Sequence, residues 1–267
     1  MRGTHAAAIG SIDVRIAFIG DSFTEGLGDE QPDGSVRGWA DRVVDGLAAS
    51  GQEVWYTNFA IRGRMLPPIA GEQLDDALAL DPLPDLIVVN GGGNDMMRPN
   101  YSTERCAALL KSVVVRTEAA GVALLVLSGP NPADHLFLSS TFHRRGRELT
   151  DAIPPLIAGH AHARFVSCYD DQELRDGRYW SDDRMHLNPL GHARVAAIVL
   201  SALGVATPMP DPGEPVPRRT ARTDLAYTRR IILPWAGRRL RGISAGDGRS
   251  PKFATWTEIA PPGPETA

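Results

Sequence analysis

An apolar run that ends in a glycine and a serine constrains this chain more than any other feature. Four of the five residues from 16 to 20 are apolar, with no alternating polar side chains, which is typical of a strand covered on both faces of its sheet. The run leads directly into Gly20-Asp21-Ser22, where the glycine permits a sharp turn and a helix can begin. Open α/β folds bind ligands at the carboxyl ends of their parallel strands, which makes Ser22 a candidate nucleophile. The tripeptide alone leaves open a second interpretation, in which Ser22 only caps the helix.

Four more segments have the composition of strands, and predicted helices separate them. The strands are expected near residues 53–59, 86–89, 122–127 and 165–166. The helices are expected near residues 39–50, 72–80, 102–120, 142–158 and 189–203. This alternation predicts an α/β fold, in which a parallel sheet carries helices on both faces.

A histidine with a nearby carboxylate can supply the base that a serine nucleophile needs. Of the seven histidines, His186 follows Asp183 by three residues, directly before the last predicted helix. A local turn there would place the carboxylate against Nδ1 and leave Nε2 free for the Ser22 proton. Asp182 competes for the orienting role, and we interpret His192 as a helix surface residue.

Attack on an ester carbonyl creates an oxyanion, which needs hydrogen-bond donors already in position. Three groups at predicted strand ends are candidates: the backbone N–H groups of Ser22 and Gly63, and the side-chain amide of Asn94. Two methionines that follow Asn94, Met96 and Met97, are candidates for an apolar wall beside an acyl chain.

Arg62 precedes the candidate oxyanion glycine and is a candidate for contact with an acidic group of the substrate, although such arginines more often form surface ion pairs. No metal-binding motif or dinucleotide fingerprint is present, and His160-x-His162 has no acidic partner nearby in the sequence. We therefore expect neither a metal nor a cofactor.

The composition bounds the compartment and the class of protein. With 43% hydrophobic and 22% charged residues, the chain has the composition of a soluble globular protein. No apolar run approaches the ~20 residues that cross a bilayer, and the amino terminus lacks the apolar core of a signal peptide. Cys106 and Cys168 are too few for a disulfide framework, so both are interpreted as packing residues. A cytoplasmic protein is expected.

The last quarter of the chain differs from the rest. Residues 206–217 are rich in proline, which marks a linker, and residues 242–267 have the composition of a flexible tail. Between them, residues 217–242 hold eight arginines against one acid, whereas residues 1–216 hold 18 basic and 28 acidic side chains. We predict one folded domain over 1–205 and an extension over 206–267 that is not an independent domain. The extension is expected to dock on the acidic body; contact with an anionic membrane is an alternative, and nucleic acid is not an expected partner.

Four short blocks in this order resemble those of the SGNH (GDSL-type) hydrolases. The blocks are Gly20-Asp21-Ser22, Gly63, Gly92-Gly93-Asn94-Asp95 and Asp183-Arg184-Met185-His186. The resemblance spans roughly residues 15–203, and the extension is similar to those of actinobacterial relatives. One departure is Phe23, which stands where the family has an aliphatic residue.

This resemblance implies a three-layer α/β/α sandwich with five parallel strands in flavodoxin-like order. It also implies Ser22 as nucleophile, His186 as base, Asp183 as its orienting acid, and an oxyanion hole from Ser22, Gly63 and Asn94. The expected activity is metal-independent hydrolysis of small carboxylic esters (short acyl, lysolipid or acetylated carbohydrate) through an acyl-enzyme. Acyl transfer at the same site, and a non-catalytic binding protein that uses the basic extension, are the alternatives.

Overall fold

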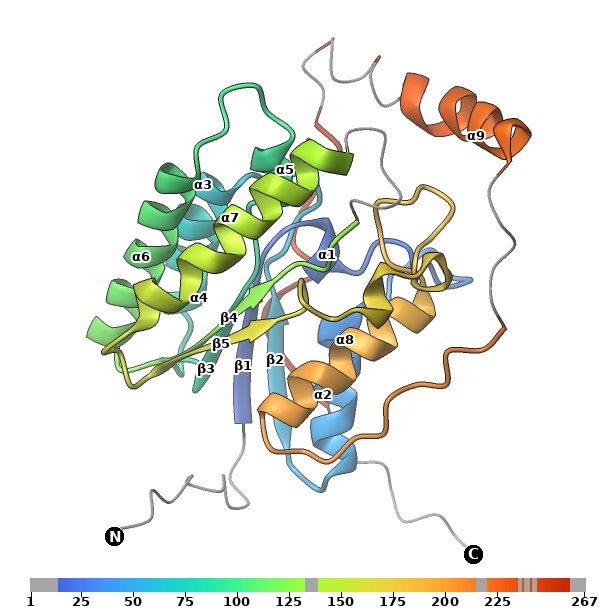
Figure 1. Ribbon diagram of the computed structural model, residues 1–267. Helices are drawn as coiled ribbons and strands as arrows, with labels where there is room; N and C mark the ends of the chain where they lie inside the picture. Colours follow the sequence, from blue (N-terminus) through green and yellow to red (C-terminus); the bar gives the residue numbers. More distant parts are fainter. Residues whose placement is uncertain are drawn as a thin grey trace, which may run out of the picture.

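A single mixed sheet organises the molecule (Figure 1). The computed structural model describes residues 14–132, 139–214, 220–234, 237, 241 and 244–259. The strand order is β5-β4-β3-β1-β2-β6, and the first five strands of the chain are parallel. The bounds of the strands are β1 Val14–Ile19, β2 Val54–Asn58, β3 Leu86–Val89, β4 Ala123–Ser128, β5 Ala163–Ser167 and β6 Phe253–Ile259.

Helices cover both faces of this sheet, which confirms the predicted three-layer α/β/α sandwich (Figure 1). One face carries α2 (Trp39–Ala49) and α8 (Pro189–Ala202), which pack against each other. The other face carries α6 (Thr103–Ala119), α7 (Ser139–Ile157) and the segment made of α3 (Leu66–Pro68), η1 (Ile69–Gln73) and α4 (Leu74–Leu78). Short helices complete the chain: α1 Ser22–Glu25, α5 Gly93–Met96, η3 Glu173–Arg175, η4 Gly177–Tyr179, α9 Ala221–Tyr227 and η5 Thr228–Ile232.

The side chains of β1 divide between the two cores, as its unbroken apolar sequence requires. Ile16 and Phe18 pack with the α2–α8 layer, while Ala17 and Ile19 pack with the α6–α7 layer. All four are at most 1% exposed. A strand buried in this way on both faces holds the turn that follows it in a fixed position, and that turn carries Ser22.

The sheet has one strand more than the five that the sequence predicts. Residues 253–259 were expected to belong to a flexible tail, but they form β6, which pairs antiparallel with β2. Phe253 packs edge-on against Tyr56, with 5.0 Å between the ring centres. Trp256, in the middle of β6, donates from Nε1 to the carbonyl of Pro82 at 3.1 Å. The prediction missed β6 because its partner lies about two hundred residues earlier in the chain.

Two further features are the state of the cysteines and the apolar character of the helices. Both cysteines are unpaired and buried, and burial raises the pKa of the Cys106 thiol to about 11. In the described part of the chain, no helix combines the length and the apolar character that would let it cross a membrane.

Candidate active site

The turn after β1 places Ser22 at the first position of α1. Asp21 caps this short helix, because its Oδ1 accepts the N–H of Phe23 at 3.1 Å. A Cβ on Gly20 would lie 2.5 Å from Thr24 Oγ1, so only glycine fits at the end of the strand. The Ser22 side chain is therefore not the cap; it remains available to groups across the sheet edge.

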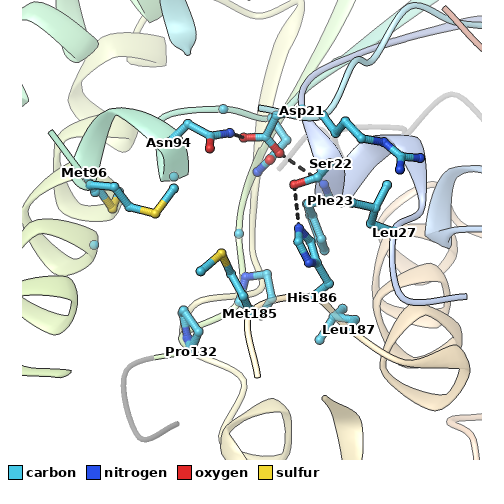
Figure 2. Close-up of a pocket in the computed structure, with 18 of the residues that line it drawn as sticks. Asp21, Ser22, Phe23, Leu27, Asn94, Met96, Pro132, Met185, His186 and Leu187 are labelled. Atoms are coloured by element: carbon cyan, nitrogen blue, oxygen red, sulfur yellow. Dashed lines mark hydrogen bonds between the residues drawn. The ribbon is translucent and has the colours of Figure 1, made fainter. Parts of the chain in front are cut away.

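The three residues of the predicted triad lie in one hydrogen-bonded chain, and Figure 2 shows its bond between Ser22 and His186. His186 Nε2 is 3.0 Å from Ser22 Oγ, and His186 Nδ1 is 2.5 Å from Asp183 Oδ2. Asp183 Oδ1 also accepts the backbone N–H groups of Met185 and His186, both at 2.9 Å. The competing residue, Asp182, is exposed to solvent and makes no hydrogen bond to the imidazole.

The surroundings of Asp183 keep it ionised. Burial by itself would raise the pKa of this carboxyl, but the hydrogen bond and the charge of His186 hold the pKa well below its usual range. A carboxylate on Nδ1 fixes the tautomer in which Nε2 carries the lone pair, and it stabilises the imidazolium that forms when Nε2 takes a proton.

The three candidate oxyanion donors differ in their present partners. Within the described residues, the backbone N–H groups of Ser22 and Gly63 make no hydrogen bond. Asn94 Nδ2, by contrast, donates to Asp21 Oδ2 at 3.1 Å and to the carbonyl of Arg64 at 3.0 Å. Both hydrogens of this amide are thus engaged, and an oxyanion would have to take one of them from its present acceptor.

Asp21 is a buried carboxyl in direct contact with this machinery. It is 5% exposed, and burial raises its pKa to about 6, against the lowering effects of the Phe23 N–H, His186 and Asn94. Its contacts tie the Ser22 turn to Asn94, which follows β3. From the sequence alone, this connection between the Ser22 turn and Asn94 could not be distinguished from ordinary stabilisation of a loop by an aspartate.

A cavity of about 670 Å³ opens beside Ser22 and His186. Met96 and Met97 line it, and Figure 2 shows Met96, Met185 and Pro132 around the same space. Buried apolar side chains of the α6–α7 layer and of β3 and β4 also line it: Val89, Leu110, Val126, Leu127, Leu149 and Ile153.

Arg62 also borders the cavity, but its charge is already neutralised. Its guanidinium is 2.5 Å from Glu25 Oε1, and its backbone N–H donates to Glu25 Oε2 at 2.6 Å. Glu25 is 8% exposed, so this is a largely buried pair. The pair gives Arg62 a structural role, the alternative that the sequence left open, and leaves it a poor partner for an anionic substrate group.

His192 was predicted to be a surface residue, and that prediction is wrong. It is fully buried where α8 packs on α2: Nδ1 accepts the N–H of Trp39 at 3.2 Å, and Nε2 donates to the carbonyl of Leu27 at 2.9 Å. Burial lowers the pKa of His192 to about 4, so this imidazole is neutral. Its ring stacks on that of Phe23, with centres 6.4 Å apart, and so packs against the turn that carries Ser22.

A second cluster of titratable groups lies at the opposite edge of the sheet, before β5. Glu118, distant in sequence, brings Oε2 to 2.8 Å from His160 Nδ1 and Oε1 to 3.6 Å from His162 Nδ1. Lys111 Nζ is 2.6 Å from His160 Nε2. With Lys111 donating to Nε2 and Nδ1 donating to Glu118, the cluster forms a hydrogen-bonded relay between two charges.

Residues of the C-terminal extension also line the cavity, which sequence reasoning missed. They come from η5, from the residues that follow it and from the turn before β6: Arg230, Ile231, Ile232, Pro234, Ala245 and Arg249. Figure 1 shows α9 on the side of the molecule where α1 and α5 lie. The mixture of arginines and apolar residues in this part of the extension was the signal that could have indicated a segment with one side in solvent and the other on an apolar surface.

Comparison with solved structures agrees with this architecture. The acetylxylan esterase Axe2 of Geobacillus stearothermophilus is similar over 74% of this chain and 96% of its own, with 20% identity and a TM-score of 0.56. The psychrotrophic esterase EstA of Pseudoalteromonas sp. is similar over 71% and 96%, with 16% identity and a TM-score of 0.55. The hydrolase LAE5, from the metagenome of Lake Arreo, is similar over 73% and 97%, with 18% identity and a TM-score of 0.57. At these identities the likeness establishes the fold.

Comparison by sequence establishes the family. No curated protein matches the chain. The family model described as GDSL-like lipase/acylhydrolase matches residues 18–194, about two thirds of the sequence. The chain therefore belongs to the GDSL-like lipase/acylhydrolase family and is an ester-hydrolysing serine hydrolase.

Proposed function

We propose that Ser22, His186 and Asp183 hydrolyse carboxylic esters through a covalent acyl-enzyme. The observation that carries the proposal is the hydrogen-bonded chain from Ser22 Oγ to His186, 3.0 Å, and on to Asp183, 2.5 Å. A serine hydroxyl is a weak nucleophile by itself, and this arrangement supplies the base and its orienting carboxylate.

In the first half-reaction, Ser22 Oγ bonds to the ester carbonyl carbon while its proton passes to His186 Nε2. The tetrahedral intermediate then loses the alcohol oxygen, which takes that proton from the imidazolium. In the second half-reaction, water gives a proton to Nε2 and attacks the acyl carbon, and the proton returns to Ser22 Oγ as the acid leaves. Asp183 stays a carboxylate throughout, in keeping with its lowered pKa.

The oxyanion of each intermediate is proposed to bind to the N–H groups of Ser22 and Gly63 and to the amide of Asn94. The two backbone donors are unused in the described part of the chain and are held in place by turns. Asn94 would exchange its bond to the Arg64 carbonyl for one to the oxyanion, since an anionic acceptor makes the stronger hydrogen bond.

The cavity favours an acyl group larger than acetyl. Its interior is apolar and its volume of about 670 Å³ lies within the range of drug-sized ligand sites. Each buried methylene of an acyl chain contributes roughly 0.8 kcal/mol of binding free energy. Axe2 is an acetylxylan esterase, whereas the volume and the apolar lining of the present cavity support a different acyl preference for this chain.

Two further proposals concern the position of the extension and the acceptor of the acyl group. We propose that the extension remains docked on the body of its own chain, a view supported by the ion pair of Lys252 with Asp41 at 2.7 Å and by the pairing of β6 with β2. Hydrolysis is favoured over acyl transfer because the family that matches residues 18–194 is described as lipase/acylhydrolase. A purely binding role is disfavoured by the complete triad geometry.

A fluorophosphonate probe and a panel of esters test the catalytic proposal. The full chain should form a stoichiometric adduct at Ser22, and Ser22→Ala should abolish both labelling and turnover. Asn94→Ala should lower kcat about 10²–10³-fold, the usual effect of removing one oxyanion donor. Turnover that survives in Ser22→Ala would overturn the mechanism. Transfer of the acyl group to added glycerol instead of water would assign acyl transfer.

The extension is tested with vesicles of anionic lipid. Binding to these vesicles that is lost on removal of residues 217–267, with the stability of the protein unchanged, would contradict self-docking.

A further inference from the structure

The C-terminal extension is attached to the loop that carries the proposed base. Arg184 lies between Asp183 and His186, and its Nη1 is 2.8 Å from Asp224 Oδ1 of α9. Its guanidinium also lies over the ring of Tyr227, 4.1 Å from the ring centre. Tyr227 is only 9% exposed, so α9 covers this loop at a buried contact.

The extension is also attached to the loop that carries the proposed oxyanion glycine. A Cβ on Gly63 would lie 2.7 Å from Ser244 Oγ, and a Cβ on Gly246 would lie 2.2 Å from the carbonyl of Arg62. Neither position has room for a side chain, because the two backbones pass in direct contact. The extension thus contacts both of the loops that flank Ser22.

Between these two attachments the extension supplies the outer wall of the cavity. Its apolar members include Ile231 and Ile232, and its charged members are Arg230 and Arg249, both exposed. Arg249 donates from Nε to the carbonyl of Ala245 at 3.2 Å, and its two terminal amino groups make no hydrogen bond to any residue that the structure describes.

The charge balance of the cavity leaves these two arginines without a counter-ion. No carboxylate among the described residues pairs with Arg230 or Arg249. The third arginine of the cavity, Arg62, is neutralised by Glu25, and the acid nearest the base, Asp183, is paired with His186. The cavity therefore combines an apolar interior with a positively charged outer wall.

We propose that Arg230 and Arg249 form a subsite for an anionic group, a phosphate or a carboxylate, in the alcohol part of the substrate. This inference rests on the proposed function, because the apolar interior then takes the acyl chain and the alcohol faces the exposed wall. Guanidinium groups bind phosphate and carboxylate through paired, charge-assisted hydrogen bonds. The subsite lies outside residues 18–194, so it is an addition to the family domain.

The test compares three esters that share one acyl chain: decanoylglycerol, its phosphate monoester, and decanoylglycerate. The full chain should hydrolyse one or both anionic esters with a kcat/KM at least about tenfold above that of the neutral one, because a hydrogen bond between charged groups is stronger than one between neutral groups. The double variant Arg230→Gln/Arg249→Gln should lose that preference. Added salt should weaken it in the full chain.

The matched control is Arg229→Gln, on the neighbouring position of η5, exposed and outside the cavity lining. It should retain the preference. A preference for the phosphate ester alone or for the glycerate ester alone supports the subsite and assigns its ligand. Equal hydrolysis of all three esters by the full chain, or a preference that survives in the double variant, overturns the inference. No hydrolysis of any ester, with no probe adduct on Ser22, refutes instead the proposed function on which the inference rests.

Discussion

At the scale of single residues, two buried groups beside Ser22 respond to pH in opposite directions. Burial raises the pKa of Asp21 from 3.8 to about 6, so its contribution to stability is complete below pH 3.8 and is lost as the pH rises through 6. Burial lowers the pKa of His192 from 6.5 to about 4, so its contribution is complete above pH 6.5 and is lost as the pH falls through 4. The two effects share one pH window and largely offset each other.

Asp21→Asn should remove the Asp21 effect and retain that of His192. The free energy of unfolding of this variant should rise between pH 4 and pH 6.5, by on the order of 3 kcal/mol, because one pKa unit corresponds to about 1.36 kcal/mol. Urea denaturation at a series of pH values measures this slope. Asp183 does not interfere, since its pKa is lowered and its effect falls below this window.

His192→Gln supplies the opposite case. Glutamine keeps a donor for the Leu27 carbonyl but cannot ionise, so stability should fall as the pH rises from 4 to 6. If both variants show the same pH slope as the full chain, burial does not perturb these groups in the way that their positions require.

At the scale of elements, the loop of Gly63 and the turn of Ser244 pack against each other so closely that a single methyl group should disturb both. Gly63 has φ of 78°, a region that disfavours other residues, and an added Cβ would meet Ser244 Oγ at 2.7 Å. Gly63→Ala should therefore lower stability by about 1–2 kcal/mol for the backbone strain, and by more for the contact. It should also lower kcat, because the Gly63 N–H is displaced.

Gly121→Ala separates the two causes. Gly121 has a similar φ of 71°, and nothing lies within 4 Å of an added Cβ, so this variant carries the strain alone. Adding Ser244→Ala to Gly63→Ala should recover part of the stability lost to the contact. A Gly63→Ala protein that is no less stable than Gly121→Ala by thermal unfolding would show that the loop and the turn do not touch.

Contacts between residues close in the sequence could be predicted from it, whereas contacts between distant residues could not. The contact between His186 and Asp183 was predictable because the two residues are only three positions apart, so one local turn brings them together. The apolar strands were predictable because burial on both faces leaves a direct pattern in the residues. The burial of His192 was not, because it depends on how α8 packs on α2. The partner of Arg62 was likewise hidden, since Glu25 lies 37 residues earlier in the chain.

At the scale of the whole molecule, β6 closes the edge of the sheet beside β2. The five parallel strands would otherwise end at β2 with unpaired backbone groups, and an exposed edge is a template for pairing with another chain. In the structure β6 fills that place from Val54, opposite Ile259, to Asn58, opposite Phe253. Lys252, directly before the strand, donates to Asp41 of α2 at 2.7 Å. The extension that lines the cavity is thus held by the sheet itself.

Deletion of residues 253–267 should leave β2 as a free edge. The free energy of unfolding should fall by about 3 kcal/mol, because Phe253 and Ile259 pack on the α2–α8 core and each such side chain contributes roughly 1.5–3 kcal/mol when fully buried. The deletion variant should also associate as its concentration rises, which light scattering after size exclusion measures. Deletion of residues 260–267 alone keeps all of β6 and serves as the control. A shorter chain that matches this control in stability and mass would mean that β2 needs no partner, and that the outer wall of the cavity is held only by Arg184 and the Gly63 loop.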